Sequence, residues 1–227
     1  MPDPGFILWS GRMRKLLLGL ALVVGAGFVI AQAPPAVPPA VPPATPPAAA
    51  ASTEYFPLKE GSKWVYKVGE SEVTVQVGAT AAGETKLDTI ANGKPVASET
   101  VQVKADGVYR TKINATAIEP PVKILELETK DGKLVPKAKG AKWTVASKVQ
   151  AQAVAGDFMI GDVAKLKIMD KDVDCVYVEG PKFNIAGTET SVKYYFAAGK
   201  GIVKLSYSIQ GAEATLELKS YEEGKPK

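Results

Sequence analysis

The side chains that most often perform chemistry in proteins are scarce in this sequence of 227 residues. It contains no histidine, which excludes a Ser-His-Asp triad, a Cys-His pair and an imidazole metal site. Its single cysteine, Cys175, cannot form an internal disulfide or a CxxC redox pair. Because Cys175 begins the apolar run 175–178, we expect a buried and unreactive thiol.

Three aspartates, Asp170, Asp172 and Asp174, have the spacing of the first ligands in a calcium-binding loop. The rest of that loop is missing, because Cys175 stands where the sharp turn needs glycine and Pro181 where a bidentate glutamate is needed. The tract also lies between two strand-like runs. We therefore expect a solvated hairpin corner here and no bound metal.

The sequence also lacks the signatures of carboxylate and serine catalysis. Acidic residues such as Glu126 and Glu128 fall on the polar phase of alternating runs, as on a wet sheet face. No D-[ST]-G, G-x-S-x-G or S-x-x-K tract occurs. We predict a protein that is not an enzyme and uses no cofactor, with a histidine-free hydrolase as the remote alternative.

Alternation of apolar and polar residues predicts the elements that carry these side chains. It is clearest in the runs 72–77, 109–113, 164–168, 203–209 and 212–218. In the run 109–113, Tyr109, Thr111 and Ile113 share one face and Arg110 and Lys112 share the polar face. Tight-turn pairs separate many of the runs: Asn92-Gly93, Asp106-Gly107, Asp131-Gly132 and Gln210-Gly211.

This pattern predicts an all-β fold with about ten to twelve antiparallel strands. A sheet of that size has to curl, close or split into two layers. We therefore expect one large, strongly curved antiparallel sheet, a half-barrel or barrel, with a β-sandwich as the alternative. Six aromatic residues are candidates for lining its hollow, although most aromatic residues are expected in the core. They are Trp64, Tyr66, Tyr109, Trp143, Tyr177 and Tyr207.

The N-terminus has the features of an export signal. Three basic residues within 12–15 precede the uncharged apolar run 16–30. We expect a signal peptide over residues 1–31, cleaved after Ala31, whose true start could be Met13. An uncleaved membrane anchor is the alternative, since the 18 residues 16–33 are at the lower limit of the length that spans a bilayer.

A linker rich in proline and alanine follows over residues 32–52. Its repeated Pro-Pro-Ala units favour an extended polyproline II segment or a disordered spacer. The remaining residues, 53–227, are long enough for a single all-β domain with a sizeable core.

Two motifs near the ends of this domain resemble those of a loose group of uncharacterised exported bacterial β-proteins. The first, FPLxxGxxWxY, covers residues 56–66, and the second, YxFxxGxGIVK, covers residues 194–204. The resemblance implies an opening strand matched by a late hairpin. Some members are similar in architecture to periplasmic lipoprotein carriers, which implies a carrier or binding role and assigns no site residue.

The charge balance limits the possible partners. Without residues 1–31, which hold three basic residues and one acidic residue, the net charge falls from +4 to +2. So balanced a chain gives no reason to expect nucleic acid. We expect an exported bacterial protein, periplasmic or extracellular, that binds an apolar or lipid-like ligand and meets a membrane only through an uncleaved N-terminal segment. A structural or protein-interaction module of the cell envelope is the alternative.

Overall fold

The computed structural model describes residues 52–224, so the predicted signal peptide and nearly all of the predicted linker lie outside the described residues. All regular elements in the described part are strands. They are β1 (Lys63–Val68), β2 (Ser71–Ala81), β3 (Glu84–Ala91), β4 (Lys94–Lys104), β5 (Gly107–Ile113), β6 (Thr116–Lys130), β7 (Lys133–Pro136), β8 (Lys142–Val149), β9 (Gln152–Ile168), β10 (Lys171–Ile185), β11 (Thr188–Ala197), β12 (Gly201–Ile209) and β13 (Ala212–Glu222). Within this part of the chain, no helix is long and apolar enough to cross a membrane.

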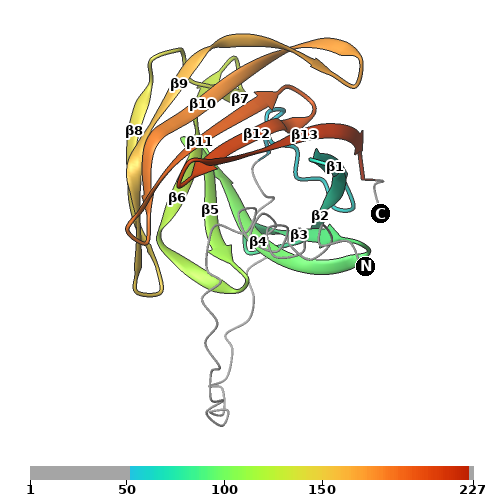
Figure 1. Cartoon of the computed structure of the whole chain (residues 1–227). Coiled ribbons are helices and arrows are strands. Elements are labelled where there is room, and N and C mark those ends of the chain that lie inside the picture. The colour runs from blue at the N-terminus through green and yellow to red at the C-terminus, as the bar shows by residue number, and fades with distance from the viewer. Residues whose placement is uncertain (1–51, 225–227) are drawn as a thin grey trace, which may run out of the picture.

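The strands form one antiparallel sheet that closes into a barrel (Figure 1). Neighbours in the sheet are mostly neighbours in sequence, except that β1 pairs with β13 and β6 pairs with β8. Pairing between β5 and β6 closes the ring of twelve strands, and β7 adds to the end of β6 outside it. The predicted all-β fold with a strongly curved antiparallel sheet is confirmed, in its barrel form.

Short hairpins connect most of the strands, as the turn signals predict. At the β3–β4 turn, Asn92 and Gly93 have φ values of 51° and 71°. Asp131-Gly132 and Gln210-Gly211 also have positive φ at both residues. Two-residue turns of this kind match the right-handed twist of the strands that they join. The local sequence therefore fixes many of the pairings of the ring.

The segment before β1 lies across one end of the barrel. The Thr53 hydroxyl donates to the backbone oxygen of Leu134 at 2.7 Å, and the Gly199 N–H donates to the backbone oxygen of Glu54 at 2.8 Å. Phe56 is buried and its ring centroid lies 6.5 Å from that of Phe196. We call residues 53–58 the plug, because they close the barrel end where the β11–β12 turn lies.

The opposite end of the barrel is less tightly filled. Here the inward phase of β11 and β12 contains Val192, Leu205, Tyr207 and Ile209, all only half-buried. At the plug end, in contrast, Trp64 is buried on the inward phase. The lumen is therefore most accessible near the β12–β13 turn.

Candidate ligand site in the barrel lumen

An ion pair lies inside the barrel. Arg110 on β5 and Glu99 on β4 face the lumen, and the Arg110 Nε contacts a carboxylate oxygen of Glu99. The Arg110 side chain is 9% exposed and that of Glu99 is 24% exposed. Tyr194 on β11 lines the same cavity wall as Arg110 and contributes to raising its pKa. The centre of the lumen is therefore charged and polar.

The register of β4 and β5 explains why a charged residue faces inward. Lys112 pairs with Thr100 and Arg110 pairs with Val101, so the ladder skips Thr111. This irregularity puts Arg110 on the lumen side, next to the buried Val101, and leaves Tyr109 on the outside. The prediction that Arg110 lies on the polar outer face of its strand is therefore wrong. An extra residue in one strand shifts all side chains beyond it to the other face of the sheet.

The environment of the ion pair stabilises the charged form of Arg110. Burial opposes the charge, but Glu99 and Tyr194 outweigh it and raise the pKa of Arg110 above its usual range. Tyr66, on β1, donates its hydroxyl proton to the backbone oxygen of Ile202 at 2.8 Å. Burial, together with the nearby Glu99 charge, raises the pKa of Tyr66 well above its ordinary value. Tyr66 therefore stays neutral and Arg110 stays charged.

Two cavities flank Arg110. The Trp64 cavity, about 60 Å³, lies towards the plug, with Phe56, Trp64, Tyr66 and Glu99 in its wall. The Tyr207 cavity, about 50 Å³, lies towards the accessible end; its wall includes Phe158, Tyr194 and Tyr207. Arg110 and Leu205 line both cavities. Each has room for a few water molecules or a small chemical group.

Three of the six aromatic candidates line these cavities. Trp64 and Tyr66 are in the wall of the Trp64 cavity, and Tyr207 is in the wall of the Tyr207 cavity. Tyr109, Trp143 and Tyr177 line neither cavity. Arg110 and Glu99, the charged residues of the site, were not among the predicted ligand-lining residues. Alternation of apolar and polar residues does not reveal that the β4–β5 pairing skips Thr111.

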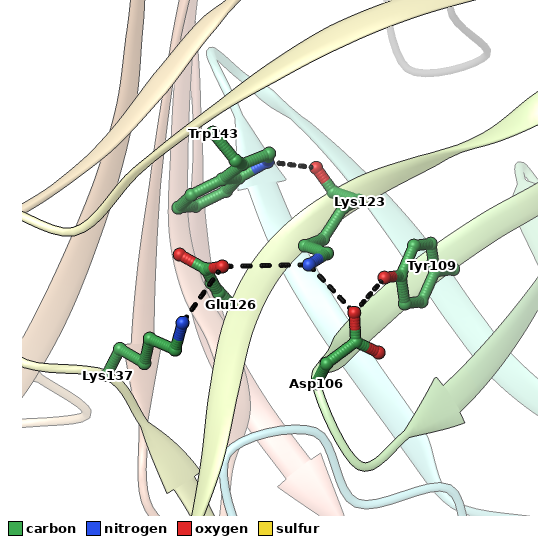
Figure 2. Close-up of polar contacts among 6 residues, drawn as sticks. All are labelled: Asp106, Tyr109, Lys123, Glu126, Lys137 and Trp143. Carbon is green, nitrogen blue, oxygen red and sulfur yellow. Dashed lines mark hydrogen bonds and ion pairs between the residues drawn. The ribbon is translucent and has the colours of Figure 1, made fainter.

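Tyr109 belongs to a polar cluster outside the lumen, on the seam that closes the barrel (Figure 2). Its hydroxyl donates to Asp106 at 2.5 Å, and Lys123 Nζ donates to the same carboxylate at 2.9 Å. The charges of Asp106 and Lys123 are thus paired with each other. The cluster joins the β4–β5 turn to β6.

Trp143 and Glu126 extend this cluster towards β7 and β8 (Figure 2). The Trp143 indole N–H donates to the backbone oxygen of Lys123 at 2.9 Å. Glu126 lies 3.7 Å from Lys123 Nζ and 3.2 Å from Lys137 Nζ. This carboxylate is held between two lysines, one on β6 and one in the segment that follows β7.

Tyr177 lies on the outer face of β10. A methyl group added at Gly161 would come within 2.0 Å of its ring, so the ring occupies the space that a side chain at Gly161 would fill. The Lys193 ammonium lies 5.0 Å from the centre of the ring, and the ring centroid of Tyr195 lies 5.8 Å away. Through these contacts, the Tyr177 ring packs on the outer face of the barrel and does not face the lumen.

The residues around Cys175 form the β9–β10 hairpin. Met169 and Asp170 make the turn with positive φ, and Asp172 and Asp174 follow in β10. Over residues 52–224, no group of three histidine, cysteine or acidic residues is placed to hold a metal ion. Cys175 is completely buried, and burial together with the charge of Asp174 raises the pKa of its thiol to about 11.

Comparisons with known proteins concern only the overall fold. The sequence matches no protein-family model and no curated protein. One similar solved structure is a candidate lipoprotein from Parabacteroides distasonis, 12% identical, which covers 75% of this chain and 99% of that chain with a TM-score of 0.49. Another is a candidate exported protein with a YmcC-like fold from Bacteroides fragilis, 11% identical, which covers 74% and 99% of the two chains with a TM-score of 0.46. At these values, neither comparison assigns the chain to a family.

Proposed function

We propose that this protein is an exported, non-enzymatic binding protein whose barrel lumen holds a small amphipathic ligand. The observation that carries the proposal is the Arg110–Glu99 ion pair, which lies between two cavities with largely apolar walls. A ligand with one polar group and an apolar remainder matches this arrangement. The polar group would meet Arg110, and the apolar part would fill a cavity.

The energetic cost of the ion pair supports a role beyond folding. Taking two charges out of water is expensive, and a well-packed apolar pair of similar volume is often as stable or more stable. The lumen nevertheless has a guanidinium at its centre, where its N–H groups can meet whatever enters either cavity. Buried polar groups that converge on an apolar cavity are typical of ligand sites.

The size of the cavities bounds the ligand. With about 50 and 60 Å³ of free space, each cavity accepts a short apolar group but not a long acyl chain. Leu205 lies in the wall of both, so a rotation of this side chain is the simplest way to join them. Entry would be from the accessible end, past Tyr207, because the plug covers the other.

Tryptophan fluorescence tests the proposal. Titration of the purified protein with 1-hexanol should change the emission saturably, with a Kd in the micromolar range or weaker, about −8 kcal/mol at best. A ligand in the Trp64 cavity should give a change that disappears in Trp64→Phe, whereas a ligand in the Tyr207 cavity should give one that disappears in Trp143→Phe, because Trp143 stacks on Phe158 in the wall of that cavity. No saturable change in the folded wild-type protein would contradict ligand binding in the lumen.

The small cavity volumes favour one alternative, a structural or protein-interaction module of the cell envelope. In that role the packed lumen would only support the barrel, and the polar outer face would meet a partner protein. The fluorescence titration separates the two functions, since the alternative predicts no binding of 1-hexanol.

The proposed export rests on the N-terminal sequence. A basic segment followed by an apolar run is typical of a cleaved signal peptide. Mass spectrometry of the protein from the envelope fraction should give an N-terminus at Gln32. A full-length species that resists carbonate extraction would instead support a membrane anchor.

A further inference from the structure

The lumen has a balanced pair of charges. Arg110 and Glu99 are the charged residues in the walls of the two cavities; the other lining residues are apolar or carry hydroxyl groups. Glu99 already supplies the counter-charge of Arg110. A ligand that brings another charge would therefore leave the site with an unpaired charge away from water.

Arg110 supplies the largest set of hydrogen-bond donors beside the cavities. A guanidinium has five N–H donors and no acceptor. The ion-pair partner of Arg110 is Glu99, and among the described residues its buried Nε makes no well-aligned hydrogen bond. The Tyr66 and Thr190 hydroxyl protons are already donated to the backbone oxygens of Ile202 and Phe183. Arg110 can therefore still donate a hydrogen bond to an oxygen atom of a ligand.

We infer that the lumen selects ligands whose polar group is an uncharged carbonyl, such as a short ester, amide or ketone, and rejects the matching carboxylate. This inference rests on the proposed function. A carbonyl oxygen accepts an N–H group of Arg110 without disturbing the charge balance. A carboxylate would lie beside Glu99, and two like charges in a poorly hydrated site repel each other strongly.

Glu99 is therefore the residue that determines specificity. Its carboxylate neutralises the positive charge of Arg110, so Arg110 can donate hydrogen bonds to a ligand but does not attract a negative charge. Replacing Glu99 with glutamine keeps the size and an acceptor oxygen but removes the negative charge. The positive charge of Arg110 would then be free to pair with a ligand carboxylate, and the preference should reverse.

Two probes that differ only in the charged group test this inference. Methyl hexanoate and hexanoate are titrated at about pH 7, where the acid is ionised, into the wild-type protein and Glu99→Gln. In the wild type we expect the ester to bind at least about tenfold more tightly than the acid, because of the Glu99 charge. In Glu99→Gln the acid should bind more tightly than the ester.

Glu217→Gln is the matched control, since Glu217 lies on the outside of the barrel, 2.7 Å from Lys204, with a side chain 57% exposed. It should keep the wild-type preference. Equal or tighter binding of hexanoate by the wild type would overturn the inference and leave the proposed function intact. Binding of neither probe would overturn the inference if 1-hexanol binds, and would contradict the proposed function if 1-hexanol does not bind either. If Glu99→Gln does not fold, hexanamide provides the second test, because an amide should also outcompete hexanoate in the wild type.

Discussion

Trp64 donates its indole N–H to the backbone oxygen of Lys200 at 2.6 Å, across 136 positions of sequence. The bond joins the FPLxxGxxWxY segment to the YxFxxGxGIVK segment, the two motifs that the sequence places near the ends of the domain. Gly201 lies beside it, where an added methyl group would be 3.3 Å from Pro57 and 3.6 Å from Trp64. The two motifs thus form one contact at the plug end of the lumen.

Loss of this contact should weaken the fold. Trp64→Phe retains an aromatic ring to stack on Tyr221, whose centroid lies 5.6 Å from that of Trp64, but it removes the hydrogen bond. The Lys200 carbonyl is then left without this donor. We expect the free energy of unfolding in urea to fall by about 1–2 kcal/mol. An unchanged unfolding midpoint would show that the bond contributes nothing to stability.

The ion pair in the lumen should show strong coupling between its members. Arg110→Met leaves Glu99 partly buried without a counter-charge, and we expect a loss of about 3–5 kcal/mol of unfolding free energy. Adding Glu99→Gln to Arg110→Met should restore a large part of that loss. A double-mutant cycle measured by urea denaturation gives the coupling. Additive effects of the two substitutions would contradict a direct interaction.

The buried thiol should make stability fall at alkaline pH. Burial raises the pKa of Cys175 to about 11 from its ordinary value of 9.0. Between these values the unfolded chain releases the thiol proton and the folded protein keeps it, so the unfolded state gains. From about pH 8 to about pH 10, we expect a loss of about 1 kcal/mol from this group.

Cys175→Ala is the control for this effect, because other groups, such as tyrosines, also titrate in the alkaline range. The stability difference between wild type and Cys175→Ala should shrink by the same amount over that range. A difference that stays constant with pH would mean that the thiol has no raised pKa in the folded protein.

Much of the fold could be predicted from the sequence, because its signals are local. Alternation gives strands, and pairs such as Asn92-Gly93 give the turns between them. The site could not be predicted in the same way. The inward position of Arg110 depends on a pairing that skips Thr111, and its partner Glu99 is identified only when β4 and β5 are aligned. Registry between strands is information that alternation does not contain.

The aromatic candidates show the same limit. Trp64 and Tyr207 fall on the inward phase of their strands and line cavities. Tyr177 is as aromatic as either, but it lies outside because its ring covers Gly161 on the neighbouring strand. Residue type alone does not distinguish an aromatic side chain in the lumen from one packed on the outer face.

This packing on the outer face is itself testable. Gly161→Ala places a methyl group where the Tyr177 ring lies, so we expect a loss of about 1–3 kcal/mol of unfolding free energy. In a Tyr177→Ala background the same change should cost much less, because the space is empty. Equal costs in the two backgrounds would contradict the contact.

The most direct test of the lumen as a ligand site is to observe where a ligand sits. Leu205 lines both cavities, whereas Val163 is 65% exposed on the outside of the barrel. In a protein with carbon-13-labelled leucine and valine methyl groups, bound 1-hexanol should give intermolecular NOEs to Leu205 and none to Val163. NOEs confined to Val163, or none to any inward-facing methyl group at saturating 1-hexanol, would contradict binding in the lumen.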